Sequence, residues 1–345
     1  MKRFAVITGL LAGLFFGVAT PFSKLLLEDF NSFQLAGLLY LGAALVMVPF
    51  ILRKNQNIRL LFKSRNRKTT LGIVFFGGIL GPVLLLAGLR LSNAASVSIW
   101  LNLELVATAL LGVVFFKDSL DKRAWIGVIL TLSAGIVTSL GAGMSGLTSG
   151  LFIAAACFCW GVDNHLTALS DGASPQAVTF VKGLAAGVVN FSIGCILSTQ
   201  SIQLGSIFPA LVVGAFSYGL SIVLYVTSAQ NIGATRSQIL FSTAPLWGVL
   251  LSYLIFADSF QWMHLLALGL LALAIFTMNT LSHSHLHAHE VMEHTHYHKH
   301  DDGHHQHEHE DGLSAKGHSH MHRHEALTHE HLHFPDLHHR HKHDK

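Results

Sequence analysis

Charged side chains are scarce through most of this sequence, which has 345 residues, 51% of them hydrophobic and 12% charged. The first 281 residues carry 16 Lys or Arg and 8 Asp or Glu, whereas a water-soluble domain has about 25% charged residues. The three cysteines, Cys157, Cys159 and Cys195, fall in apolar stretches, which excludes a disulfide framework. Dinucleotide-binding, Walker, zincin and nucleophile-elbow motifs are also missing. These absences exclude a soluble enzyme core, and we expect a membrane protein that is not an enzyme.

Long uncharged stretches are what the sequence has instead. A helix that crosses about 30 Å of hydrocarbon needs roughly 20 mainly apolar residues. Ten stretches of about this length are separated by polar breaks, at residues 4–27, 33–52, 70–89, 94–116, 124–140, 150–169, 176–198, 206–229, 235–257 and 261–281. The predicted fold class is therefore an all-α membrane protein with ten transmembrane helices.

Basic residues are concentrated in particular connections between these spans. The connection over residues 53–68 contains seven Lys or Arg, and the connection after the fourth span adds Lys117, Lys122 and Arg123. The first connection instead has Glu28 and Asp29. Because cytoplasmic loops are enriched in Lys and Arg, we expect a multi-pass protein of the inner membrane with both termini in the cytoplasm.

The two halves of the apolar region repeat each other. A shift of 144 residues aligns Gly17-Val18 with Gly161-Val162, and a shift of 140 aligns Asp118-Ser119 with Asp258-Ser259. Each half holds five spans, and an odd number places the second copy upside down in the bilayer. Such inverted repeats are typical of alternating-access transporters. The predicted domains are a first five-helix repeat over 1–142, a second over 149–281, and a tail over 282–345.

Two corresponding segments lie in the fourth and ninth spans. One runs from Leu103-Glu104-Leu105 to Phe115-Phe116-Lys117-Asp118, and the other from Ala244-Pro245-Leu246 to Phe256-Ala257-Asp258. With these segments, residues 4–281 resemble the EamA-type drug/metabolite transporter superfamily, whose usual pattern is Glu-Pro-Leu followed by Leu-Gly-Glu. Leu105 replaces the first Pro here, and Asp replaces the last Glu. The resemblance implies two five-helix repeats that export a small solute, with proton linkage.

A further pair of segments resembles one bacterial subgroup of that superfamily. The pair combines Cys159-Trp160-Gly161-Val162-Asp163-Asn164 with Phe334-Pro335-Asp336-Leu337-His338-His339 in a His-rich tail. The substrates of this subgroup are largely unassigned. The combination is also similar to His-tailed members linked to nickel and cobalt resistance.

A few polar side chains lie inside predicted spans, where a charge at the helix centre costs roughly 2.5–3.5 kcal/mol. Glu104 lies near the middle of the fourth span, and Asp163 and Lys182 lie at about the same depth on adjacent antiparallel helices, so we expect the latter two to pair. Proton coupling needs a carboxyl group such as that of Glu104, whose charge changes as the site alternates. The predicted substrate pathway comprises Glu104, Asp163, Asn164, His165, Lys182 and Asn190.

Structural alternatives stay open for several of these residues. Asp163 and Lys182 could form a satisfied pair that only fixes helix packing, and His165 could be a hydrogen-bonded core histidine. Pro82 and Pro245 fall in the third and ninth spans, where each could mark a bend near the pathway or an ordinary kink.

The tail holds 23 of the 25 histidines and has little apolar surface, so it is expected to be disordered without a ligand. Imidazole suits Ni, Co, Zn and Cu, and a flexible chain can fold several His around one ion. Divalent transition metals are therefore expected on the tail, with no cofactor required by the core. The candidate metal ligands are His283, His285, His287, His289, His294, His296, His298, His300, His318, His320, His322 and His324.

Three functions are compatible with these patterns. The favoured one is export of a small solute by alternating access, with a metal-binding cytoplasmic tail, and the mixed charges of the spans suit an amphoteric cargo. The second is efflux of Ni, Co or Zn ions, and the third is a membrane-anchored metal reservoir or sensor without transport. The expected partners are the lipid bilayer and a small-molecule or metal substrate, with no nucleic acid, and a homodimer stays open.

Overall fold

The computed structural model describes two separate units, one over Met1–Leu281 and one over Ser282–Lys345. In the first unit the described residues are 2–53, 58–116, 122–141, 143–169, 174–198, 202–232, 240–256 and 261–279. In the second they are 284–289, 292–298, 318–324 and 327–332. The aligned Asp118-Ser119 and Asp258-Ser259 lie outside these residues, as do His283, His300 and the segment 334–339.

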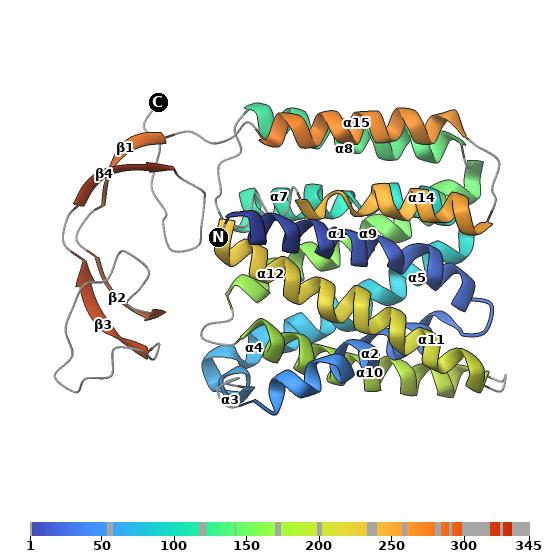
Figure 1. Ribbon diagram of the computed structural model, residues 1–345, viewed down its shortest axis with the longest axis horizontal. Coiled ribbons are helices and arrows are strands. Elements are labelled where there is room, and N and C mark those ends of the chain that lie inside the picture. Colours follow the sequence, from blue (N-terminus) through green and yellow to red (C-terminus); the bar gives the residue numbers. More distant parts are fainter. Residues whose placement is uncertain are drawn as a thin grey trace. The chain divides into compact units, whose positions relative to one another are not determined.

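The first repeat is built from helices only (Figure 1). The structure confirms all five predicted spans of this half, four of them long enough to cross a membrane and the fifth a shorter apolar helix. The elements are α1 (Lys2–Leu26), α2 (Ser32–Ile51), α3 (Ile58–Leu61), α4 (Ser64–Gly72), η1 (Ile73–Leu80), α5 (Gly81–Leu91), α6 (Ala94–Trp100), α7 (Leu103–Phe116) and α8 (Lys122–Gly141).

The second repeat follows the same order. Three of its apolar helices are long enough to cross a membrane, and two shorter ones correspond to the ninth and tenth predicted spans. Its described elements are α9 (Gly143–Ala168), α10 (Pro175–Leu197), α11 (Leu204–Gly214), η2 (Ala215–Leu220), α12 (Ser221–Ile232), α14 (Ala244–Phe256) and α15 (Trp262–Asn279).

Four of the spans are interrupted, at positions that correspond in the two repeats. The third and eighth spans contain the π-helical segments η1 and η2, whose last residues, Leu80 and Leu220, are 140 residues apart. The fourth span has a turn at Leu101–Asn102, and the ninth has one at 242–243. We call these turns the first and second break. The sequence left a bend open at Pro82 of the third span and Pro245 of the ninth, but it did not predict the π segments or the mid-span turns, because these leave the apolar pattern unchanged.

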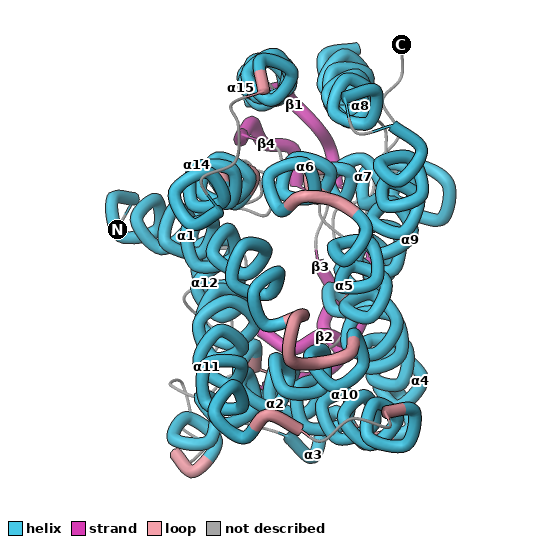
Figure 2. Tube along the Cα trace, turned by 90° about the vertical axis from the view of Figure 1, so that its right-hand side faces the viewer, coloured by secondary structure: helices cyan, strands magenta, loops and turns pink. Residues whose placement is uncertain are grey.

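Corresponding helices of the two repeats pack against each other. α2 packs along α10, and α8 packs along α15 at one edge of the bundle (Figure 2). α6 of the fourth span and α14 of the ninth span are also in contact. This pairing of equivalent helices is expected when two inverted copies are related by a two-fold axis in the membrane plane.

Glycines bring some of these helices into backbone contact. A Cβ added at Gly37 of α2 would lie 2.4 Å from the Phe191 nitrogen of α10, and one at Gly214 of α11 would lie 2.0 Å from the Leu39 oxygen of α2. Small residues at such interfaces allow close packing where lipid removes the hydrophobic drive for helix association. The position of α2 between α10 and α11 therefore depends on glycine.

The described part of the tail forms strands, where the sequence predicted no regular structure. β1 (Ser284–His289) pairs antiparallel with β4 (Leu327–Leu332), and β2 (Met292–His298) pairs antiparallel with β3 (His318–His324). The register sets His294 opposite His322 and His296 opposite His320. Alternation of His with other residues has the period of two that a strand requires, which is compatible with this pairing.

Replacing Gly214 by Ala should weaken the contact between α11 and α2. The added Cβ meets backbone that cannot rotate away, so we expect a loss of about 1–3 kcal/mol and a lower apparent melting temperature in detergent. Gly205→Ala in the same helix is the matched control, because its Cβ would meet nothing within 4 Å. Equal melting temperatures for the two variants would contradict the close packing.

Candidate functional site

A cavity lies where the two breaks meet α1, and we call it the break cavity. From α1 its wall includes Phe16, Gly17 and Thr20. The first break and its flanking helices contribute Ser98, Leu101, Asn102, Glu104 and Leu105. The second break contributes Phe241, Ser242, Ala244 and Pro245. Discontinuous helices from both repeats therefore form one site, as in transporters with inverted repeats.

Several residues make the breaks possible next to α1 and α9. The thiol of Cys157 donates long contacts to the Trp100 and Leu101 carbonyls in the middle of the span, at 3.8 and 3.7 Å. The Leu101 oxygen also accepts a hydrogen bond of 3.1 Å from the Glu104 N–H. Gly17 allows α1 to approach the second break, since a Cβ there would lie 2.4 Å from the Ala244 oxygen. Pro245 is the second residue of α14, where its missing N–H costs nothing.

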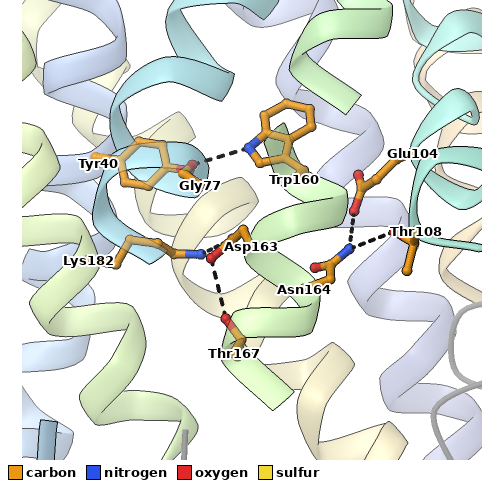
Figure 3. A network of polar contacts seen from close by, with 9 residues as sticks. All are labelled: Tyr40, Gly77, Glu104, Thr108, Trp160, Asp163, Asn164, Thr167 and Lys182. Atoms are coloured by element: carbon orange, nitrogen blue, oxygen red, sulfur yellow. Dashed lines mark hydrogen bonds and ion pairs between the residues drawn. The ribbon is translucent and has the colours of Figure 1, made fainter. Parts of the chain in front are cut away.

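Glu104 lies in the first turn of α7 and belongs to the cavity wall. Its Oε1 accepts a hydrogen bond of 2.9 Å from Asn164 Nδ2 of α9 (Figure 3). The same amide nitrogen donates to Thr108 Oγ1 at 3.3 Å, one turn further along α7. The hydrogen-bond partner of Glu104 therefore comes from the neighbouring helix α9.

His165 is the next residue of α9 and also contacts α7. Its Nε2 lies 2.9 Å from the backbone oxygen of Thr108. A hydrogen-bonded core histidine makes a contact of this kind, so the contact agrees with the structural alternative considered for His165.

Asp163 and Lys182 form a buried ion pair, as their depths in adjacent spans predicted. Lys182 Nζ lies 2.7 Å from Asp163 Oδ2, and the two side chains are 8% and 7% exposed (Figure 3). The Thr167 hydroxyl donates to the other carboxylate oxygen at 3.3 Å. A charge-assisted hydrogen bond of this length offsets part of the cost of burying both charges.

The ion pair packs directly on η1. A Cβ at Gly77 would lie 2.2 Å from the carboxyl group of Asp163, so only glycine fits there. The Gly77 oxygen accepts hydrogen bonds from Tyr40 Oη at 2.6 Å and from Trp160 Nε1 at 3.2 Å (Figure 3). Asn190 Nδ2 donates to the Gly78 oxygen at 3.0 Å. Side chains from three helices thus satisfy carbonyls of the π-helical segment.

The predicted pathway residues therefore separate into two places. Glu104 is in the wall of the break cavity, whereas Asp163, Asn164, His165, Lys182 and Asn190 lie on the helices behind it and are not among its described lining residues. The sequence missed Asn102, which is 6% exposed and whose Nδ2 has no hydrogen-bond partner in the described part of the chain. The sequence feature that could have identified Asn102 is its position, because it is a second polar residue near the middle of the fourth span, two positions before Glu104.

Possible metal ligands are sparse within the described part of the spans. The described residues contain no group of three or more His, Cys, Asp or Glu able to hold an ion. Cys157 and Cys159 are both buried, as packing residues would be. His264, which the sequence also did not single out, is buried between Ser96 Oγ at 3.0 Å from Nε2 and Tyr253 Oη at 2.7 Å from Nδ1.

Comparison with known proteins agrees with this architecture. Residues 3–140 and 147–280 each match the EamA-like transporter family. An uncharacterized transporter of Methanothermobacter thermautotrophicus is 24% identical over 273 residues, covering 73% of this chain and 79% of the relative. The uncharacterized transporter YyaM of Bacillus subtilis is 24% identical over 230 residues, covering 61% and 73%. A protein of known crystal structure is similar with a TM-score of 0.60 and 16% identity, covering 80% of this chain and 98% of that one.

Asp163→Asn is expected to be more damaging than removal of the whole ion pair. The single change leaves the Lys182 ammonium buried without its counter-charge, a loss of about 3–5 kcal/mol. The double variant Asp163→Asn/Lys182→Met removes both charges and should recover most of the apparent melting temperature in detergent. If the double variant melts no higher than the single one, the two charges do not compensate each other.

Proposed function

Because the chain belongs to the EamA-like transporter family, we propose that it moves a small solute by alternating access around the break cavity. The observation that carries this proposal is that both repeats contribute a broken helix to one cavity. Two inverted halves can exchange conformations about such a site, so that it opens to each side of the membrane in turn.

The direction and orientation of transport are part of the same proposal. Lys and Arg are concentrated in the connections over 53–68 and 117–123, which supports an inner-membrane protein with both termini in the cytoplasm. We expect export from the cytoplasm.

Glu104 is the residue that we assign to proton coupling. It lies in the cavity wall, and a carboxyl group in a site that alternates between two solutions can take up a proton from one side and release it to the other. Its hydrogen bond to Asn164 connects the cavity to α9 of the other repeat, which gives the charge state of Glu104 a route to influence helix position.

The tail is proposed to bind divalent transition metals, and this leaves two competing functions. A metal-ion exporter would need soft or imidazole ligands along its path, but the described residues of the cavity wall include no His, Cys or Met. A metal reservoir without transport would not need a cavity at paired breaks. Both observations favour an organic solute as cargo, with the tail collecting, buffering or sensing metal.

Alternating access can be tested before any substrate is known. In a Cys195→Ser background, Thr20→Cys should react with a membrane-impermeant thiol reagent from either side of oriented vesicles, since Thr20 lines the cavity. Thr138→Cys is the matched control, because Thr138 is equally buried but lies on α8, and it should stay unreactive. Labelling of Thr20→Cys from one side only, or from neither, would contradict the proposal.

Deletion of residues 282–345 should abolish multi-site binding of Ni²⁺ or Zn²⁺, measured by isothermal titration on purified protein. A full-length variant with all 23 histidines of the tail changed to Gln controls for the length of the chain and should lose binding equally. Retention of several sites in either variant would contradict metal binding by the tail.

Growth on a metal series separates the three functions. Sensitivity of strains that lack either the whole chain or only residues 282–345 would favour metal efflux. Sensitivity only without the core would favour transport that is independent of the tail, and sensitivity only without the tail would favour the reservoir.

A further inference from the structure

The histidines of the tail strands fall on one face of each strand pair. The four strands contain twelve histidines, which alternate with other residues along each strand (Figure 1). Successive residues of a strand belong to opposite faces, and residues directly opposite each other on two strands belong to the same face. The register therefore gives each strand pair one face with all of its His and one face with none.

The register also sets His directly opposite His. The cross-strand pairs are His285–His331 and His287–His329 between β1 and β4, and His294–His322, His296–His320 and His298–His318 between β2 and β3. His329 and His331 were not among the candidate ligands from the sequence. Resting on the metal binding by the tail proposed above, we propose that each cross-strand pair holds one divalent transition-metal ion, so that the ions join β1 to β4 and β2 to β3.

Opposed positions suit an ion that takes two imidazole ligands. Cβ atoms of directly opposite residues are about 4.5–5.5 Å apart, whereas two residues along one strand advance it by about 6.5–6.8 Å. The His across the sheet is therefore nearer than the next His along the strand. Imidazole is a ligand for Ni, Co, Zn and Cu, and a pair is the smallest unit that chelates such an ion. The other coordination positions are open to water.

The same register runs through both strand pairs. Residues 290–291 separate β1 from β2, and residues 325–326 separate β3 from β4. Because these two connections are equal in length, the opposition of residues in β2 and β3 continues in β1 and β4. On the face without His, Glu293 lies opposite Arg323, and opposite charges at such positions stabilise strand pairing. A slip of one residue would separate these charges and set each paired His opposite another residue type.

Metal binding and strand pairing are linked by this arrangement. An isolated pair of strands is marginally stable in water, and β2 and β3 are joined only through the long connection over residues 299–317. An ion with one ligand on each strand binds fully only when the strands are paired, so it stabilises the paired form. The ions thus determine how much of the tail is in strands.

Binding through composition alone leads to a different expectation. A chain without a fixed register can gather any of its His around an ion, so its binding would follow the number of His and not their positions. The two possibilities differ when the number of His is held constant and their opposition is changed.

Two full-length variants with equal numbers of tail histidines make this comparison. In both, four His are kept and every other His of residues 282–345 is changed to Gln. The matched variant keeps His294, His298, His318 and His322, which form two cross-strand pairs. The mismatched variant keeps His320 in place of His322 and forms one pair. No slip of register gives the mismatched variant a second pair, because each combination of its His needs a different register.

Cu²⁺ is the probe, because it binds imidazole more tightly than the other divalent ions of this series and is paramagnetic. We expect the matched variant to bind two Cu²⁺ in isothermal titration, each with two imidazole nitrogens in its electron paramagnetic resonance spectrum. The mismatched variant should bind one. A second Cu²⁺ should bind it about tenfold or more weakly, since a single imidazole lacks the linked second ligand. The full-length variant without tail histidines gives the baseline.

The outcomes separate the pairing from metal binding as such. Equal numbers of tightly bound Cu²⁺ in the two variants, or four imidazole nitrogens around one ion, would overturn the pairing. If the unaltered chain nevertheless binds several ions, metal binding by the tail stands without the register. If the unaltered chain binds no more Cu²⁺ than the variant without tail histidines, metal binding by the tail fails and the pairing fails with it.

Discussion

The constraint on which this fold depends is that backbone N–H and C=O groups inside a bilayer must find partners within the protein. An uninterrupted helix meets this condition by itself, but four spans of this chain are interrupted. Carbonyls at the interruptions are satisfied by side chains of neighbouring helices: Tyr40, Trp160 and Asn190 at η1, and the Cys157 thiol at the first break. The irregular spans are therefore stable only in the assembled bundle, where these side chains are in place.

The buried polar groups of the bundle lie at two sites that differ in their partners and in their contact with the cavity. Asp163 and Lys182 satisfy each other against the glycines of η1, on the side of α9 away from the cavity. Glu104 has a neutral amide partner and faces the cavity. α9 carries the residues that contact both sites, Asp163 and Asn164, at adjacent positions. Asn164, the partner of Glu104, is thus adjacent in sequence to Asp163, which pairs with Lys182 and holds α9 against α10 and η1.

Much of the architecture could be predicted from the sequence, because length and lack of charge are enough to identify spans. The ten spans follow from these two properties, and the two repeats follow from residues that align at shifts of 144 and 140. Counting residues from the span ends is enough to pair Asp163 with Lys182. Glu104 and Pro245 were singled out from the sequence, but most of the cavity wall was missed, since residues such as Phe16 and Gly17 have the composition of ordinary apolar packing. Breaks and π segments leave no mark on apolar periodicity. In the tail, the alternating His that was interpreted through its composition also has the period of two of the described strands.

The π-helical segments have one more consequence for the way each span meets its neighbours. A π turn holds about one residue more than an α turn, and one residue advances the helix by roughly 100°. Side chains beyond η1 therefore face a different direction from the one that an unbroken α-helix would give them. α4 meets α9, and η1 meets α9 and α10, whereas α5 meets α1, α2 and α6 as well as α9. The third span therefore presents one set of side-chain directions before η1 and a rotated set after it. The eighth span has the same rotation at η2, in the inverted repeat.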